Sequence, residues 1–162
     1  MLADIVARLA TADDAKGIAA LSRDLIEYGM PWRWRPERIL KAMRQPDVNV
    51  AVVGPKGAPI AFGIMEYQEE DAHLLLFAVT EQHQRKGVGS ALLGWLEEVA
   101  RAAGARRIEL EARRQNEPAR CFYNEHGYHE WAVERGMYRP TIDGVRLEKW
   151  LRPASSEKRS DA

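Results

Sequence analysis

The chain has 162 residues, and its 24 Lys and Arg residues balance 24 Asp and Glu residues to a formal net charge of +0. The length fits one domain with its own core. The even charge and the lack of an uncharged apolar run long enough to span a bilayer argue against a nucleic-acid or membrane partner. Cys121 is the only cysteine, which excludes an internal disulfide and a thiolate metal site, and with an N-terminus unlike a signal peptide it predicts a cytoplasmic protein.

The N-terminal third predicts a strand followed by two helices. Residues 5–9 read as a short strand, and Thr11 with Asp14 forms a capping-box pattern before a helix that ends at Gly29. The inward positions of this helix would be Ala15, Ile18, Leu21 and Leu25. A connector with two tryptophans follows, and Pro36 predicts the start of a second helix. Its inward positions would be Ile39, Leu40 and Met43.

Three strands are predicted next. Residues 48–53 and 60–67, joined by a turn at 54–57, indicate an antiparallel hairpin. An acidic turn at 69–71 leads to a strand at 73–79, whose nearly continuous leucines predict burial on both faces and a central place in the sheet.

A helix with a clear apolar period follows and ends at Gly104. Its repeating positions are Val88, Leu92, Leu96, Val99 and Ala103. Residues 107–112 alternate apolar and charged side chains, which predicts a strand with one polar face.

The C-terminal part predicts one more helix and two strands. Asn116 would cap the helix, which would bury Ala119 and Phe122 and end at Gly127. Strands around 128–133 and 145–151 would be joined through Asp143-Gly144. We expect residues 1–152 to form a single domain and residues 153–162 to be a polar, disordered tail.

The most informative motif is Gln84-Arg85-Lys86-Gly87-Val88-Gly89-Ser90, which stands between a strand and an amphipathic helix. Gly87 and Gly89 leave backbone N–H groups uncovered beside the positive end of the helix, and Arg85 and Lys86 add charge. The pattern therefore predicts a site for a phosphorylated cofactor. The alternative is a purely structural role, in which the glycines only give the loop the backbone freedom that it needs.

Two other phosphate motifs fit this segment less well. A P-loop would need Gly-Lys-Ser/Thr after a glycine and four residues, and that sequence is absent. A dinucleotide-binding turn would place its third glycine at Leu92 and would follow the strand directly, whereas residues 80–84 intervene.

The motif resembles the acetyl-coenzyme A signature of the GCN5-related N-acetyltransferase (GNAT) family, Gln/Arg-x-x-Gly-x-Gly/Ala, which Gln84, Gly87 and Gly89 match. The resemblance extends over nearly the whole chain. It includes Phe77-Ala78-Val79 before the loop and Asn116-x-x-Ala119-x-x-Phe122-Tyr123-x-x-x-Gly127-Tyr128 after it.

This resemblance implies an α/β (α+β) three-layer fold. Its central sheet would be mixed, mostly antiparallel and of about seven strands, flanked by about four helices, in the order β-α-α-β-β-β-α-β-α-β-β. Acetyl-CoA would enter a V-shaped opening between the strands at 73–79 and 107–112. The implied cofactor-binding residues are Phe77, Ala78, Val79, Gln84, Arg85, Lys86, Gly87, Val88, Gly89, Ser90 and Asn116.

Two residues are candidates for catalysis. The resemblance favours Tyr123 as the general acid that protonates the leaving thiolate, although without it a packed aromatic would be the better interpretation. Glu111, on the polar face of its strand, is the first candidate for the base that deprotonates the acceptor amine. The alternatives are His73, Glu66 or ordered water as base, or a structural role of Glu111 as the ion-pair partner of Arg113 or Arg107.

The acceptor is far less defined by the sequence. Trp32 and Trp34 lie in a connector that shapes the acceptor site in similar proteins. Their indoles would either bind an apolar or cationic group of the acceptor or cover the core beneath the connector. We expect an N-acetyltransferase acting on a primary amine of a small molecule or peptide. The alternatives are acetylation of protein N-termini, as in relatives that act on ribosomal proteins, and a non-catalytic acyl-CoA-binding module. Many relatives are homodimers, so a monomer and a dimer both stay open.

Overall fold

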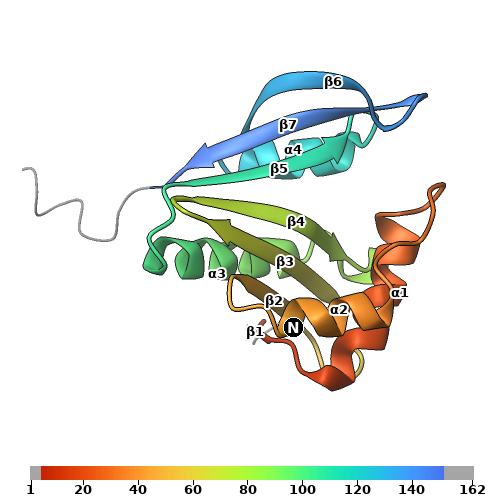
Figure 1. Ribbon diagram of the computed structural model, residues 1–162, viewed down its shortest axis with the longest axis vertical. Coiled ribbons are helices and arrows are strands. Elements are labelled where there is room, and N and C mark those ends of the chain that lie inside the picture. The colour runs from red at the N-terminus through yellow and green to blue at the C-terminus, as the bar shows by residue number, and fades with distance from the viewer. Residues whose placement is uncertain (1–4, 152–162) are drawn as a thin grey trace, which may run out of the picture. The chain divides into compact units, whose positions relative to one another are not determined.

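The computed structural model describes residues 5–151, so the tail predicted at 153–162 lies outside the described residues. Seven strands and four α-helices follow one another in this range in the predicted order (Figure 1). The strands belong to one seven-stranded sheet. The chain divides into two compact units. The first unit comprises Met1–Glu66 and Leu74–Glu98, and the second comprises Tyr67–His73 and Val99–Ala162. The assignment of residues 1–152 to one domain stays a prediction.

The first unit begins with the predicted strand and two helices. Its elements are β1 (Ala7–Leu9), α1 (Ala15–Leu25), α2 (Pro36–Met43), β2 (Val48–Val53) and most of β3 (Ala61–Gln68). The expected hairpin is confirmed, because β2 pairs antiparallel with β3 in a register that places Val50 opposite Ile64. β1 is shorter than predicted and pairs antiparallel with β2.

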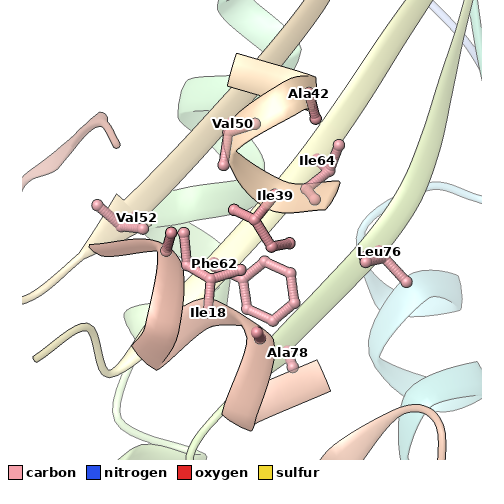
Figure 2. Packing of buried hydrophobic residues seen from close by; sticks show 11 residues of the cluster. Ile18, Ile39, Ala42, Val50, Val52, Phe62, Ile64, Leu76 and Ala78 are labelled. Carbon is pink, nitrogen blue, oxygen red and sulfur yellow. The ribbon is translucent and has the colours of Figure 1, made fainter. Parts of the chain in front are cut away.

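The core of this unit lies between the two helices and the strands. Ile18 of α1, Ile39 of α2 and Phe62 of β3 are fully buried and lie close together (Figure 2). Removing one such side chain down to alanine costs about 2 to 5 kcal/mol. Leu21, Leu25, Leu40 and Met43, predicted inward, are partly buried against this cluster.

The start of α1 is held by a buried carboxylate. The Thr11 backbone N–H donates to Asp14 Oδ2 at 2.8 Å, as the capping pattern suggested. The Arg8 guanidinium also donates to both oxygens of Asp14, at 2.9 and 3.1 Å, and the Gly57 N–H donates to Oδ1 at 2.8 Å. Asp14 therefore joins β1, α1 and the β2–β3 turn, which local sequence could not indicate.

β4 (Asp71–Val79) corrects the expectation of burial on both faces. Its burial alternates, with Ala72, Leu74, Leu76 and Ala78 buried and the residues between them only partly buried. The leucines therefore do not form one continuous buried run. In α3 (Val88–Ala102) the buried positions are Val88, Leu92, Leu93, Leu96 and Ala100, whereas Val99 is half-buried and Ala103 is exposed.

The second unit holds β5 (Arg107–Arg113), α4 (Glu117–Glu125), β6 (His129–Arg139) and β7 (Ile142–Trp150). β7 pairs antiparallel with both β5 and β6. The predicted turn at Asp143-Gly144 is wrong, because the chain turns at residues 140–141 and both residues lie within β7. Asp143 Oδ1 instead accepts from the Gly136 N–H at 2.9 Å, and a Cβ at Gly144 would overlap Met137 Sδ.

Candidate functional site

The phosphate motif forms a loop between the short 3₁₀ turn η2 (Glu81–His83) and α3. Arg85 and Gly87 both have left-handed backbone, with φ of 63° and 86°. Only glycine adopts that conformation at little cost, so at Arg85 the loop holds a strained residue, as binding loops often do. Left-handed residues just before a helix turn successive N–H groups toward one anion.

The charged side chains of this loop are accessible to a ligand. Arg85 and Lys86 are exposed, and within residues 5–151 neither forms an ion pair. The Gln84 side chain donates from Nε2 to the Val79 carbonyl oxygen at 2.9 Å, which ties the loop to the end of β4. The exposed backbone, the two cations and the N-terminal turn of α3 fit a pyrophosphate group.

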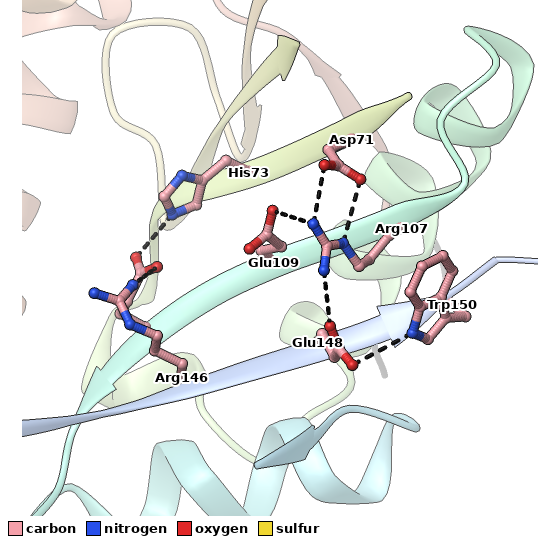
Figure 3. Close-up of polar contacts among 8 residues, drawn as sticks. Asp71, His73, Arg107, Glu109, Arg146, Glu148 and Trp150 are labelled. Atoms are coloured by element: carbon pink, nitrogen blue, oxygen red, sulfur yellow. Dashed lines mark hydrogen bonds and ion pairs between the residues drawn. The ribbon is translucent and has the colours of Figure 1, made fainter. Parts of the chain in front are cut away.

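The second unit brings together two residues that the sequence proposed separately. His73 Nε2 lies 2.7 Å from Glu111 Oε1, and Arg146 Nη1 donates to Glu111 Oε2 at 3.2 Å. Figure 3 shows the side chains of His73 and Arg146 with these contacts as dashed lines. Arg146 also pairs with Glu134. Glu111 is partly exposed, with 22% of its side-chain surface accessible, so a proton can reach it.

The arginine partner of Glu111 differs from both residues that the sequence suggested. Arg107 instead lies among Asp71, Glu109 and Glu148, at 2.9, 3.0 and 3.1 Å (Figure 3). Glu109 and Glu148 face each other across β5 and β7, and like charges in that position repel. Arg107 offsets this repulsion and is structural.

Arg146 and Tyr138 were missed by sequence reasoning. Arg146 stands directly opposite Glu111 in the β5–β7 register, which no local pattern reveals. Tyr138 lies in β6, and burial, together with the Glu111 carboxylate, raises its pKa to about 12. Its hydroxyl therefore stays protonated at neutral pH. The Arg113 guanidinium lies 6.0 Å from the centre of the Tyr138 ring.

The sequence predicted that α4 buries Ala119 and Phe122, but the buried residue of this helix is Tyr123. Those two are only half-buried, and Cys121 beside Phe122 is exposed. The Tyr123 ring packs edge-on against Phe122 and Tyr128, with centroids 5.3 and 5.8 Å away. Burial raises the pKa of Tyr123 well above its ordinary value. Tyr123 is thus both a packed aromatic and a hydroxyl that remains a hydrogen-bond donor.

The cap at the start of α4 is confirmed. Asn116 Oδ1 accepts from the Ala119 N–H at 3.2 Å. The remaining candidates lie in the first unit. Glu66 is half-buried on β3, opposite Val48 of β2. The indole of Trp32 donates to the Ala19 carbonyl at 3.2 Å, so it packs partly against α1.

No helix within residues 5–151 is both long and apolar enough to cross a membrane. No group of three or more His, Cys, Asp or Glu side chains in the same range could hold a metal ion.

Residues 18–128 match the Acetyltransferase (GNAT) family. The chain belongs to this family. The match covers the phosphate loop, Glu111, Asn116 and Tyr123, and it confirms the predicted family. No residue role is assigned by it.

The individual relatives include N-acetyltransferases. Over 88 residues the chain is 35% identical to the [ribosomal protein bS18]-alanine N-acetyltransferase of Escherichia coli, covering 54% of this chain and 59% of that protein. The Salmonella typhimurium protein of the same name is 33% identical over 84 residues, 52% of this chain and 56% of that protein. The chain thus spans little more than half the length of these relatives.

Solved structures match nearly the whole chain. Ard1 from Thermoplasma volcanium has a TM-score of 0.78 at 24% identity, with 91% of this chain and 97% of that chain covered. The Escherichia coli ribosomal-protein-S18-alanine N-acetyltransferase has a TM-score of 0.75 at 22% identity, with 93% and 96% covered. These likenesses confirm the predicted fold class, a seven-stranded mixed sheet with four helices.

Proposed function

We propose that this protein is an acetyl-CoA-dependent N-acetyltransferase that transfers an acetyl group directly to a primary amine of a small molecule or peptide. The observation that carries the proposal is the contact between His73 and Glu111 in a chain of the GNAT family. A module that only held an acyl-CoA would have no need for a proton acceptor.

Bound acetyl-CoA would supply an activated thioester. Backbone N–H groups from Arg85 to Ser90 would hold its pyrophosphate, with Lys86 adding charge. Residues 77–79 of β4 and Asn116 would hold the rest of the cofactor. A backbone N–H near Val79 would polarise the thioester carbonyl and stabilise the negative charge that develops there.

Glu111 would take the proton from the acceptor. An aliphatic amine with a pKa of about 10 is protonated at neutral pH and cannot attack until it loses that proton. His73 and Arg146 each contact one carboxylate oxygen, which fixes the direction of the remaining lone pairs. His73 would orient Glu111 and share the proton through their 2.7 Å contact.

Tyr123 would donate a hydrogen bond to the departing sulfur. A thiol has a pKa of about 8.5, and the pKa of Tyr123 is raised far above that value. Full transfer of the phenolic proton is therefore uphill, so the hydroxyl would act mainly by stabilising the thiolate. As the amide forms, the attacking nitrogen loses its second proton, and water would carry a proton to the departing sulfur.

A second candidate is the narrower case of a protein N-terminus as acceptor. The bacterial relatives are named for acetylating the alanine of a ribosomal protein. An α-amino group has a pKa of about 8, so it needs less help from a base than a lysine does. We place the reaction in the cytoplasm and expect either a monomer or a homodimer, which light scattering distinguishes.

The test measures free thiol released from acetyl-CoA with a panel of small amines and of peptides with free N-termini. We expect release above background with at least one amine, and a marked loss in Glu111→Gln and Tyr123→Phe. Peptides blocked at the N-terminus separate α-amino from side-chain acceptors. Binding of acetyl-CoA without thiol release from any amine would contradict the enzyme and favour the acyl-CoA-binding module.

A further inference from the structure

The connector between α1 and α2 is built on a buried carboxylate. Glu27 is 6% exposed. Its Oε2 accepts from Ser22 Oγ at 2.7 Å and its Oε1 from the Arg33 N–H at 2.7 Å, while the Trp34 N–H lies within 3.4 Å of both oxygens. Within residues 5–151 no cationic side chain contacts it. A buried carboxylate that is satisfied by loop N–H groups holds the backbone of that loop in one conformation.

The same connector fixes several guanidinium groups on indole rings. Arg35 lies 4.6 Å and Arg23 5.4 Å from the centre of the Trp32 ring. Arg38 lies 3.8 Å from the centre of the Trp34 ring. Within residues 5–151 the side-chain N–H groups of Arg35 and Arg38 donate no hydrogen bonds, so a cation held over a ring in this way keeps its donors available.

Arg33, Arg35 and Arg38 are exposed, and within the described residues none of them forms an ion pair. Arg23, by contrast, already binds Asp24. Glu37 is exposed in the first turn of α2, but no ion pair in the described range joins it to these arginines. The chain as a whole has a net charge of +0, so this is a local concentration of unneutralised positive charge.

We propose that the surface formed by Arg33, Arg35 and Arg38 binds an acidic peptide segment. Each guanidinium can donate two parallel hydrogen bonds to a carboxylate, and this geometry is already set before binding. Glu27 holds the backbone of the connector, and the indoles hold the side chains of Arg35 and Arg38. Less conformational entropy is therefore lost when a peptide binds.

A nucleic acid fits this surface less well. Base stacking requires free aromatic faces, and here guanidinium groups lie over both indoles. Nucleic-acid affinity also rises with the number of phosphates that a protein neutralises, and three arginines would neutralise only a few.

The proposal also narrows the acceptor, and in that respect it rests on the proposed function. If the acidic segment belongs to the acceptor, the enzyme would prefer peptides with aspartate or glutamate downstream of the free amine. A direct binding measurement keeps the two claims separate, because it does not depend on turnover.

The test uses fluorescence anisotropy with dye-labelled, N-terminally blocked peptides that contain four aspartates or, as an isosteric control, four asparagines. We expect the aspartate peptide to bind at least tenfold more tightly and to weaken as salt rises. The double variant R33Q/R38Q should bind it about tenfold more weakly. The double variant K16Q/K56Q removes the same charge from exposed lysines and should bind within about twofold of the wild type.

Equal binding of the two peptides, or equal losses in both double variants, would overturn the proposal. So would tighter binding of a single-stranded oligonucleotide that is lost in R33Q/R38Q. Thermal denaturation of each variant checks that folding is unchanged. An acidic acceptor peptide should also show a lower KM than its asparagine counterpart. If the wild type acetylates no amine, the proposed function fails, while the binding measurement still decides this proposal.

Discussion

His73 Nε2 and Glu111 Oε1 lie 2.7 Å apart although the two residues are 38 positions apart in the chain. Arg146 contacts the other oxygen of the same carboxylate. The carboxylate is therefore oriented from both sides and remains partly exposed, with 22% of its side-chain surface accessible. This arrangement suits a group that must meet an incoming ammonium in one direction.

Replacing Glu111 by Gln should lower kcat/KM at neutral pH by about 100-fold, because the amide cannot accept the ammonium proton. The rise of kcat/KM with pH should also become weaker. The measurement is thiol release between pH 6 and 10. His73→Asn should have a smaller effect, about tenfold, because it removes only an orienting partner. A Glu111→Gln enzyme with the pH profile of the wild type would exclude Glu111 as the base.

Tyr123→Phe should reduce kcat by about 100-fold while acetyl-CoA binding, measured by calorimetry, stays within about twofold. The reason is that the hydroxyl would act on the sulfur only as the bond breaks. Tyr128→Phe is a matched control, since Tyr128 packs against Tyr123 in the same buried cluster. Equal losses of turnover and of cofactor affinity in Tyr123→Phe would point to a packing role alone.

Gly87→Ala should destabilise the protein by about 1 kcal/mol and raise the KM for acetyl-CoA. Gly87 has a φ of 86°, which alanine adopts only with strain, and the change would distort the proposed phosphate loop. Gly94→Ala is the control within the same region. It lies inside α3 with no atom within 4 Å of the added methyl group, so it should stabilise the helix by about 0.5 to 1 kcal/mol. Thermal melts and acetyl-CoA titrations report both effects.

Asp14→Asn should cost about 2 kcal/mol of unfolding free energy at pH 7, because Arg8 and two backbone N–H groups lose a charged acceptor. Burial alone would raise the pKa of Asp14, but its hydrogen bonds, above all that from Arg8, hold it well below the usual range. A group with a lowered folded-state pKa stabilises the fold above its unfolded pKa of about 3.9, and this contribution is lost as pH falls below that value.

The difference between the wild type and Asp14→Asn should therefore shrink steadily below about pH 4 in urea denaturation. The neighbouring Asp13 is exposed, and Asp13→Asn should leave the unfolding free energy nearly unchanged at pH 7. A difference for Asp14→Asn that stays constant down to pH 2 would show that the carboxylate contributes by shape and not by charge.

Much of the fold could be predicted because its signals are local. The order of elements, the β2–β3 hairpin and the Asn116 cap depend on residues within one turn or hairpin of each other. The wrong predictions arose where a contact with a residue farther along the chain outweighed the local sequence preference. Asp143-Gly144 is a good turn sequence, yet Asp143 binds the Gly136 backbone and the turn forms elsewhere.

The sequence by itself determined the family, through the glycine loop and the pattern from Asn116 to Tyr128, because backbone freedom and helix capping are properties of short segments. Only the tertiary structure decided that Glu111 meets His73 and Arg146, and that Glu27 anchors the arginine-bearing connector. These contacts depend on strand register and on burial. Both are set by the packing of segments far apart in the chain, and neither appears in the local pattern of residue types.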